Sequence, residues 1–414
     1  MKEDILTHQN DPAVLEKMYR GNKAQFKKEF NTIYTQLSDT SLANFWNARL
    51  NYETKEIHPG TRADWTFILI ASLLAGVISK FPAFFAIDEE FFYPRNIGFI
   101  VFPFLTAYFA WKNKLSIGKI IFIGAVTLVG LLFINLLPNV RESDVLTLAC
   151  IHLLLVLWSV LGYAFVGGEK NGVEQRLGFL KYNGDLVVIS ALILISGGII
   201  TGITIGLFSL IGFNIERFWF DYVVIFGLAA VPLLGTYLTR ANPQMVGKVS
   251  PVIARIFSPV VLVILIVYLG AMIYSGKDPY NDREFLMIFN ALLIGVMALI
   301  FFSVAETSRE SRSRYEIWIL FLLSAVTIIV NGIAISAILF RIAEWGITPN
   351  RAAVLGANLL IFVNLFMVIG QLYKVISKRS ETYGVGKAIA LYLPVYFIWA
   401  AIVTFLFPLI FGMD

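Results

Sequence analysis

The stretch 341–351, RIAEWGITPNR, is a short polar link between two long apolar runs. It contains two arginines, a glutamate, a Trp-Gly pair and a Thr-Pro pair. The runs on its two sides, 315–340 and 351–376, are each longer than the roughly 20 residues that cross a bilayer as a helix. The alternation of a long apolar run, a short polar link and another long apolar run indicates two consecutive membrane-spanning helices.

The same pattern extends over most of the chain. Of its 414 residues, 58% are apolar and 15% are charged, whereas a soluble domain is about half apolar and a quarter charged. The mean hydropathy is +0.75. We therefore expect an all-α fold, a polytopic transmembrane helical bundle formed by residues 65–414 with the lipid bilayer as its surroundings. Its eleven apolar segments are 65–86, 96–111, 117–137, 144–166, 186–211, 219–237, 254–275, 285–304, 315–340, 351–376 and 388–411.

The lysines and arginines of the connections predict how the chain crosses the membrane. Cytoplasmic connections of a membrane protein hold most of these residues, and here the even-numbered connections hold more of them than the odd-numbered ones. This predicts a cytoplasmic N-terminus, an outer C-terminus and an outer position for the link 341–351. Because the basic residues are dispersed among the connections and form no stripe, the net charge of +5 predicts no nucleic-acid partner.

Residues 1–64 form a polar arm that precedes the first apolar segment. Its apolar residues recur at helical spacing, and Asp11-Pro12 has the chemistry of an N-cap followed by the first helical position. We predict two or three short amphipathic helices in a cytoplasmic arm. Two interpretations remain: a small helical domain packed on the bundle, or a surface that binds a cytoplasmic protein partner or lipid. Since the arm lacks the pattern of a cleavable signal peptide, the first span is expected to direct insertion.

Three residues of the link predict a sharp turn. The Thr348 hydroxyl can accept a hydrogen bond from a free amide at a helix start, and Pro349 suits the first helical position, which needs no amide. Gly346 can adopt the positive φ that most residues avoid. The next helix is therefore predicted to start at Pro349, after a turn at Gly346.

The charged residues of the link are not explained by the turn. Arg341 and Glu344 would pair if the preceding helix continued through them. Arg351 lies in the first turn of the next helix, where a positive charge is unfavourable, so we predict a contact with an acidic group such as Glu344 or with an anionic headgroup. Two interpretations remain, a structural corner and an outward-facing site for an anion or another ligand. The site would consist of Arg341, Glu344, Gly346, Thr348, Asn350 and Arg351.

A few polar side chains lie inside the expected spans, where they are costly and often functional. Lys80 stands near the outer end of the first span, where it either extends its ammonium to the surface or meets one of the carboxylates at 88–90. Asn331 on the ninth span, and Asn364 and Gln371 on the tenth, suit either interhelical hydrogen bonds or a polar path. No carboxylate falls in the middle of an expected span, which weakens a proton-coupled mechanism.

Gly198, Gly202 and Gly206 recur four residues apart on one face of the fifth span. Small residues at this spacing let another helix approach closely, so tight helix packing is the main interpretation. A discontinuous helix that lines a substrate site is the other one.

The chain contains no motif that identifies an enzyme. His152 is the one histidine in an expected span, Cys150 is the only cysteine, and no HExxH, GxSxG or Walker-type sequence is present. A metal site needs several convergent ligands, so neither a metal nor a cofactor is predicted.

The segment from Trp345 to Arg351 resembles the hallmark of a bacterial family of multispan membrane proteins known only as a domain of unknown function. The hallmark reads roughly aromatic-Gly-aliphatic-Thr-x-x-Arg, and Trp345, Gly346, Ile347, Thr348 and Arg351 match it. The similarity in span number and hydropathy covers about 65–411. The resemblance implies a multi-pass protein of the bacterial cytoplasmic membrane, and it implies no activity.

Two functional hypotheses follow. The first is a permease-like protein that handles a solute of unknown identity, suggested by the many spans and by the polar residues of the ninth and tenth. The second is a non-transporting scaffold or sensor whose arm, residues 1–64, binds a cytoplasmic partner. An intramembrane enzyme ranks behind both, because no acids, histidines or metal ligands cluster in the sequence.

Overall fold

The computed structural model describes residues 2–34, 37, 41–51, 61–140, 142–167, 172–210, 213–241, 256–270, 274, 280, 283–307, 314–378 and 382–413. These residues are helical or lie in turns and bends, with no strand among them. The chain divides into two compact units, Met1–His58 and Pro59–Asp414.

The first unit contains four short helices around its own apolar core. They are α1 (Lys2–Thr7), α2 (Pro12–Gly21), α3 (Lys23–Ile33) and α4 (Ser41–Asn51). The side chain of Asp11 accepts hydrogen bonds from the amides of Ala13 and Val14, and Pro12 is the first residue of α2, which confirms the predicted start. The core joins all four helices and consists of Ile5, Leu15, Phe26, Phe30, Ile33, Leu37, Ala43, Trp46 and Leu50.

Glu16 links α2 to α4 on the surface of this unit. Its carboxylate lies 2.8 Å from Arg20 Nε on the same helix and 3.0 Å from Arg49 Nη1 on α4. The Arg49 guanidinium also lies over the rings of Tyr19 and Trp46. These contacts fix α4 against α2 at the rim of the core.

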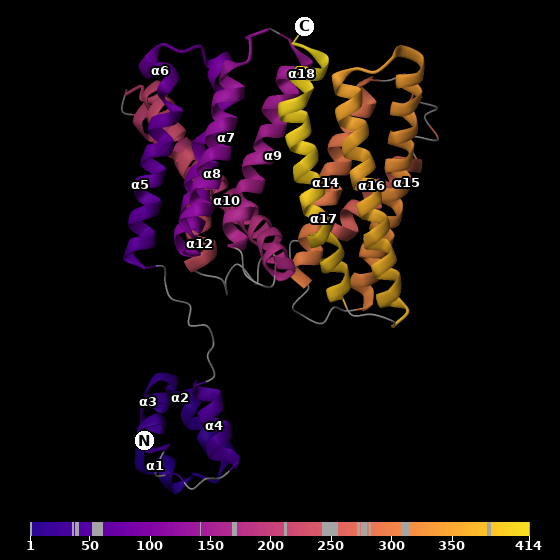
Figure 1. The fold of residues 1–414 in the computed structure, drawn as a ribbon. Helices are drawn as coiled ribbons and strands as arrows, with labels where there is room; N and C mark the ends of the chain where they lie inside the picture. The colour runs from indigo at the N-terminus through magenta and orange to yellow at the C-terminus, as the bar shows by residue number, and fades with distance from the viewer. Residues whose placement is uncertain are drawn as a thin grey trace. The chain divides into compact units, whose positions relative to one another are not determined.

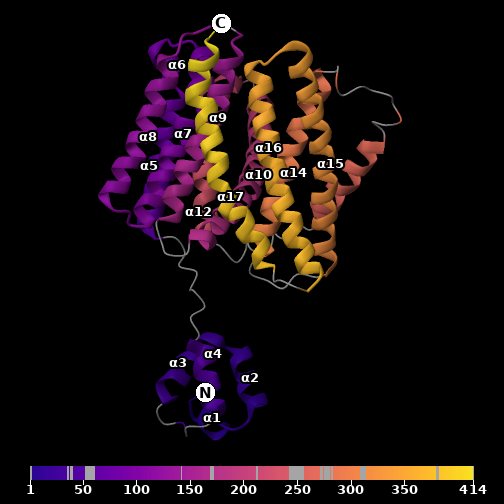
Figure 2. The same cartoon turned by 45° about the vertical axis from the view of Figure 1, so that its right-hand side comes forward.

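The second unit is a bundle of long helices (Figures 1 and 2). In chain order its elements are α5 (Arg62–Ser79), α6 (Phe81–Phe85), α7 (Glu89–Lys112), α8 (Ile117–Leu136), α9 (Asp144–Val166), α10 (Gly172–Leu210), α11 (Glu216–Phe218), η2 (Trp219–Val224), α12 (Ile225–Ala241), α14 (Arg283–Thr307), α15 (Arg314–Trp345), α16 (Pro349–Ile376), α17 (Tyr383–Ala401), η3 (Ile402–Leu406) and α18 (Phe407–Phe411). A further apolar helix covers Ile256–Gly270.

Within the described residues, eight helices are long and apolar enough to cross a membrane. They are Arg62–Ser79, Ile117–Leu136, Asp144–Val166, Gly172–Gly206, Glu216–Ala241, Arg314–Trp345, Pro349–Ile376 and Tyr383–Phe411. The other three predicted segments fall on α7, on Ile256–Gly270 and on α14. The all-helical, multi-span architecture agrees with the sequence, and the number of eleven spans stays a prediction.

Two boundaries differ from those expected. The fifth span was predicted to begin at residue 186, but α10 begins at Gly172, so Arg176 and Lys181 lie on a helix and not in a connection. Apolarity alone misplaced this boundary because a helix continues without difficulty through charged residues near its end. The second segment is also longer than predicted, because α7 includes Phe91 and Phe92 and continues through Pro103.

The two ends of the bundle differ in charge. At one end α5 and α10 begin and α7 and α16 stop; at the other lie the α15–α16 link and the C-terminus (Figure 1). We call these the Thr61 end and the Arg351 end. The described basic residues concentrate at the Thr61 end, which carries Arg62, Lys112, Lys114, Lys119, Arg176, Lys181, Arg240, Arg314, Lys374, Lys378 and Lys387.

Four apolar clusters hold the described part of the bundle together, and two of them are large. One is built mainly by α5, α7, α9, α10 and α12 and includes the large rings of Tyr108, Phe109 and Tyr182. The other joins α14, α15, α16 and α17 and includes Leu293, Leu323 and Leu365. The second cluster surrounds the polar side chains described next.

Candidate functional site

A layer of polar side chains lies inside the second apolar cluster, near the midpoints of three long helices. Asn331, Asn364 and Tyr396 are close to the middle of α15, α16 and the continuous helix 383–411. Asn331 and Asn364 are each 0% exposed. In a helix that crosses a bilayer, such positions lie at the level where transporters place their substrate sites.

A short chain of hydrogen bonds joins α15, α16 and α14. Asn331 Nδ2 donates to the backbone carbonyl of Asn358 at 3.0 Å, and Asn358 Nδ2 donates to Asn290 Oδ1 at 2.6 Å. Helical spacing places Asn358 on a different face of α16 from Asn364 and Gln371. Its contact with Asn331 was missed because it runs through the backbone of the neighbouring helix, which spacing along one helix does not show.

Asn364 is the centre of the layer. Neither its Nδ2 nor its Oδ1 meets a hydrogen-bond partner among the described residues. The Tyr396 hydroxyl lies close enough to interact with the Asn364 amide, but the two groups do not reach the geometry of a regular hydrogen bond. Each buried polar group without a partner costs about 1–3 kcal/mol. An apolar side chain would avoid that cost, so these groups are unfavourable for folding alone.

Further polar atoms of the same helices share this property. They are Ser324 Oγ and Asn331 Oδ1 on α15, Trp399 Nε1 on α17 and Thr404 Oγ1 on η3, all buried and without a hydrogen-bond partner in the described part of the chain. Uncharged donors and acceptors thus predominate. Buried donors and acceptors of this kind can exchange hydrogen bonds with an uncharged polar molecule.

The backbone of the helix that carries Tyr396 is irregular on both sides of it. Pro394 lies inside α17, and residues 402–406 form the π-helical segment η3. A π-helical turn inside an α-helix frequently marks a functional site. On the α16 side, the Trp399 ring occupies the space where a Cβ at position 356 would lie, so Gly356 permits close contact between the two helices.

The other predicted intramembrane residues lie outside this layer. Gln371 is half-buried, two turns beyond Asn364 on α16. Lys80 is buried between α5 and α6, and its ammonium lies 5.0 Å from the centre of the Tyr222 ring on η2. The ammonium therefore neither extends to the surface nor pairs with the carboxylates at 88–90, because burial beside an aromatic face offers a cation–π contact instead.

The expectation of tight packing at Gly198, Gly202 and Gly206 is wrong for a single chain. A Cβ at any of the three would meet no atom of the described residues within 4 Å. The second half of α10 is largely exposed, since the helix extends past the neighbours that cover its first half. The spacing indicated one face correctly, but it carried no information on what covers that face.

The turn in the link 341–351 forms as predicted. The Thr348 hydroxyl accepts a hydrogen bond from the amide of Arg351 at 3.3 Å, and Pro349 is the first residue of α16. Gly346 has a φ of +75°. The preceding helix α15 continues to Trp345 and therefore through Arg341 and Glu344.

The arginines of the link bind backbone carbonyls and not Glu344. Arg351 Nη1 donates to the carbonyls of Trp345 at 3.0 Å and Gly346 at 2.6 Å, at the C-terminus of α15. Arg341 Nε donates to the carbonyl of Tyr280 at 2.8 Å. Glu344 is exposed and forms no ion pair with either arginine.

The positive charge of Arg351 interacts unfavourably with the positive end of the dipole of its own helix, α16. The negative end of the α15 dipole is adjacent and compensates for this repulsion. Both guanidinium groups also lie within 6 Å of the Trp345 ring, at 5.8 Å for Arg341 and 5.7 Å for Arg351. Contacts within the chain thus explain the positions of both arginines. Asn350 is half-buried in the first turn of α16. A ligand at this corner stays a prediction.

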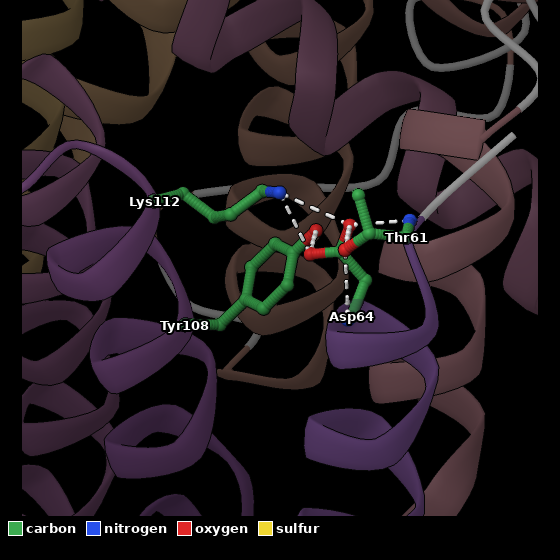
Figure 3. A network of polar contacts seen from close by, with 4 residues as sticks. All are labelled: Thr61, Asp64, Tyr108 and Lys112. Atoms are coloured by element: carbon green, nitrogen blue, oxygen red, sulfur yellow. Dashed lines mark hydrogen bonds and ion pairs between the residues drawn. The ribbon is translucent and has the colours of Figure 1, made fainter. Parts of the chain in front are cut away.

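A charged network at the Thr61 end was not anticipated (Figure 3). Asp64, buried in the first turn of α5, lies 2.8 Å from the Lys112 ammonium at the end of α7 and accepts the Tyr108 hydroxyl at 3.5 Å. Thr61 and Asp64 form a reciprocal capping box. Each charge suits the dipole of its own helix, so the network anchors the start of α5 to the end of α7. The Thr-x-x-Asp spacing was a usable signal for it.

Two more buried charges were missed. Asp185 is buried within α10, one residue before the predicted start of the fifth span. It was missed because that start was placed too late. Arg95 on α7 is buried as well and donates to the carbonyl of Ile134 in the last turn of α8 and to those of Leu137 and Pro138, which directly follow this helix. A cavity of about 540 Å³ lies beside Arg95.

Across the described residues, no group of three or more His, Cys, Asp or Glu side chains is arranged to hold a metal ion. Comparisons with models of protein families, with curated proteins and with solved structures found no match for this chain.

Proposed function

We propose that this protein is a permease-like membrane protein that binds a small, uncharged polar solute at the layer formed by Asn331, Asn364 and Tyr396. The observation that carries the proposal is the fully buried amide of Asn364, which has no partner for either its donor or its acceptor in the described residues. Polar residues inside membrane helices commonly mark solute pathways. The irregular backbone around Tyr396 supports the same assignment, because transporter sites use interrupted helices.

The polar groups of the layer favour an uncharged solute. They are amides and a hydroxyl, and a charged solute would need a compensating charge at this depth. Asp185 is buried on α10, which packs against α17. We assign it no contact with the solute.

Uptake into proteoliposomes tests this function. The purified full chain should take up at least one solute from a panel of sugars, polyols, amides and neutral amino-acid derivatives. Tyr396→Phe, which removes only the hydroxyl, should reduce the initial rate. A complete absence of uptake and of binding over the panel would contradict the proposal.

The proposed location is the bacterial cytoplasmic membrane, with about eleven spans, a cytoplasmic N-terminus and an outer C-terminus. Three features support it: the concentration of basic residues at the Thr61 end, the eight candidate spans, and the resemblance of residues 345–351 to the bacterial multispan family. A periplasm-sensitive reporter fused after the last residue should be active, and an inactive one would contradict the orientation.

The second candidate function, a scaffold or sensor, is favoured by the first unit. This unit has its own core of nine buried side chains, yet α4 exposes Phe45 at 56%. The exposed ring of Phe45 offers one apolar contact for a cytoplasmic protein. Crosslinking in cells should recover a partner with the full chain and lose it with Phe45→Ser; equal recovery with both would remove this support.

A further inference from the structure

A cavity of about 320 Å³ lies between α8, α9, α10 and α17 near the Thr61 end. Its walls are mainly aromatic and aliphatic. They include Phe122 and Val126 of α8, Trp158, Tyr163 and Val166 of α9, Phe179 of α10, and Leu393 and Phe397 of α17. Along α9 the lining runs from residue 158 to residue 166, which at 1.5 Å per residue is about 12 Å. An apolar groove of this length suits part of an acyl chain.

Arg176 is the one charged side chain in this lining. Its Nη1 donates to the carbonyl of Ala390 at 3.1 Å. That carbonyl is available because residue 394, four positions later, is a proline and has no amide to donate. No carboxylate lies within ion-pair distance of Arg176 in the described residues. The guanidinium therefore keeps donors and a full positive charge at the edge of an apolar groove.

A second cation lies at the same end of the groove. Lys119 is one turn before Phe122 on α8, and its ammonium donates to the carbonyl of Gly167 at 2.8 Å. Gly167 directly follows Val166 of the lining. Two positive charges thus flank the polar end of the cavity, and the rest of the wall is apolar apart from the hydroxyls of Ser159 and Tyr163.

We propose that this groove binds an anionic phospholipid, with its phosphate at Arg176 and Lys119 and part of one acyl chain between α8, α9 and α17. The two positive charges would repel a cationic headgroup. A free phosphate ion has no apolar part that could fill the apolar groove, whereas a phospholipid has its acyl chains. A basic pocket between membrane helices at the Thr61 end is the arrangement expected for an anionic headgroup. The site is separate from the polar layer and does not depend on the proposed solute.

Lipid retention by the purified full chain tests the proposal. After exchange into mixed micelles with equal amounts of phosphatidylglycerol and phosphatidylcholine of identical acyl chains, native mass spectrometry gives the ratio of the two bound lipids. The wild type should prefer phosphatidylglycerol. Arg176→Gln should lower that preference about five-fold, the effect of one basic residue at an anionic surface. Arg314→Gln, an exposed arginine at the start of α15, is the matched control and should leave it unchanged.

A second variant keeps the charge and fills the groove. Val126→Trp should reduce the retention of both lipids, because the added ring occupies the space for the acyl chain while Arg176 remains. Equal preference in the wild type and Arg176→Gln would overturn the proposal, as would unchanged retention in Val126→Trp. Displacement of phosphatidylglycerol by millimolar inorganic phosphate would also overturn it, since it would show that the phosphate alone is recognised.

Discussion

Arg95 and Arg351 show how single side chains stabilise this bundle at its Arg351 end. Each carries its guanidinium to carbonyls at the C-terminal end of a neighbouring helix. Arg95 binds those of Leu137 and Pro138 directly after α8, and Arg351 binds those of Trp345 and Gly346 at the end of α15. These carbonyls have no partner within their own helix, and a positive charge there also suits the helix dipole. One guanidinium therefore both donates hydrogen bonds to the free carbonyls of a helix end and places a positive charge at the negative end of the helix dipole.

Arg351→Gln tests this role. Loss of the two hydrogen bonds to Trp345 and Gly346 should lower the free energy of unfolding by about 1 kcal/mol, a value at the lower end for charged hydrogen bonds because the contact is partly exposed. Thermal unfolding in one detergent measures it. Arg314→Gln removes an exposed arginine of α15 and should leave the melting temperature within error; the same loss in both variants would mean that the carbonyl contacts contribute nothing.

The corner also shows what residue-level prediction can supply. Thr348, Pro349 and Gly346 follow local rules of capping and φ, so the sequence predicted their geometry. The partners of Arg351 could not be predicted, because they depend on where α15 stops, and the apolar pattern does not define that position. Spacing on α16 alone likewise predicted polar positions at Asn364 and Gln371 without showing that only Asn364 is fully buried.

At the scale of the elements, α17 depends on a side chain from a distant part of the chain. Pro394 interrupts its hydrogen bonding, and Arg176 on α10 satisfies the Ala390 carbonyl that becomes available. The proline is evident in the sequence, but the hydrogen bond from Arg176 to the Ala390 carbonyl could not be predicted. The start of α10 was placed fourteen residues too late, so Arg176 was assigned to a connection.

The coupling between Arg176 and Pro394 is measurable. In a Pro394→Ala background the new amide of residue 394 can donate to the Ala390 carbonyl, so this contact no longer depends on Arg176. Arg176→Gln should then cost about 1 kcal/mol less in unfolding free energy than it does in the wild type. A double-mutant cycle in detergent gives the difference. Strict additivity of the two substitutions would contradict the assigned role of Arg176.

We expect the stability of the first unit to depend on pH through Glu16. The hydrogen bond from Arg20, together with the charge of Arg49, holds the pKa of this carboxyl below its ordinary value of 4.5. A lowered folded-state pKa contributes stability that is fully present above the unfolded-state pKa and is lost as the pH falls through the folded-state value. The first unit should therefore lose stability as the pH falls below about 4.5.

Trp46 lies in the core of this unit and its ring neighbours the Arg49 guanidinium. Denaturation followed by tryptophan fluorescence at pH 7 and pH 4 measures the effect, and Phe45→Ser serves as a variant of the same helix that carries no charge. Glu16→Gln should make the unit less stable at pH 7 and reduce its loss between the two pH values. An unchanged pH dependence in Glu16→Gln would contradict the assignment.

At the scale of the whole molecule, composition and hydropathy were sufficient for the all-helical, multi-span architecture. They were sufficient because the bilayer requires every spanning backbone group to be satisfied within its own helix. They could not predict how the helices are arranged. The polar layer, in which side chains from α14, α15, α16 and α17 come together, could therefore not be predicted either. The exposed glycine face of α10 shows the same limit, since periodicity defines a face and only the fold determines its neighbours.

The most direct test of the account concerns Asn364. Asn364→Leu removes a buried amide that has no partner in the described residues, so the free energy of unfolding should stay equal or rise, because an apolar side chain avoids the cost of burial. The rate of solute uptake should nevertheless fall to background. Gln371→Leu makes the same exchange two turns away on α16 and should keep both uptake and stability. Unchanged uptake in Asn364→Leu, or an equal loss of uptake in both variants, would contradict a solute site at the polar layer.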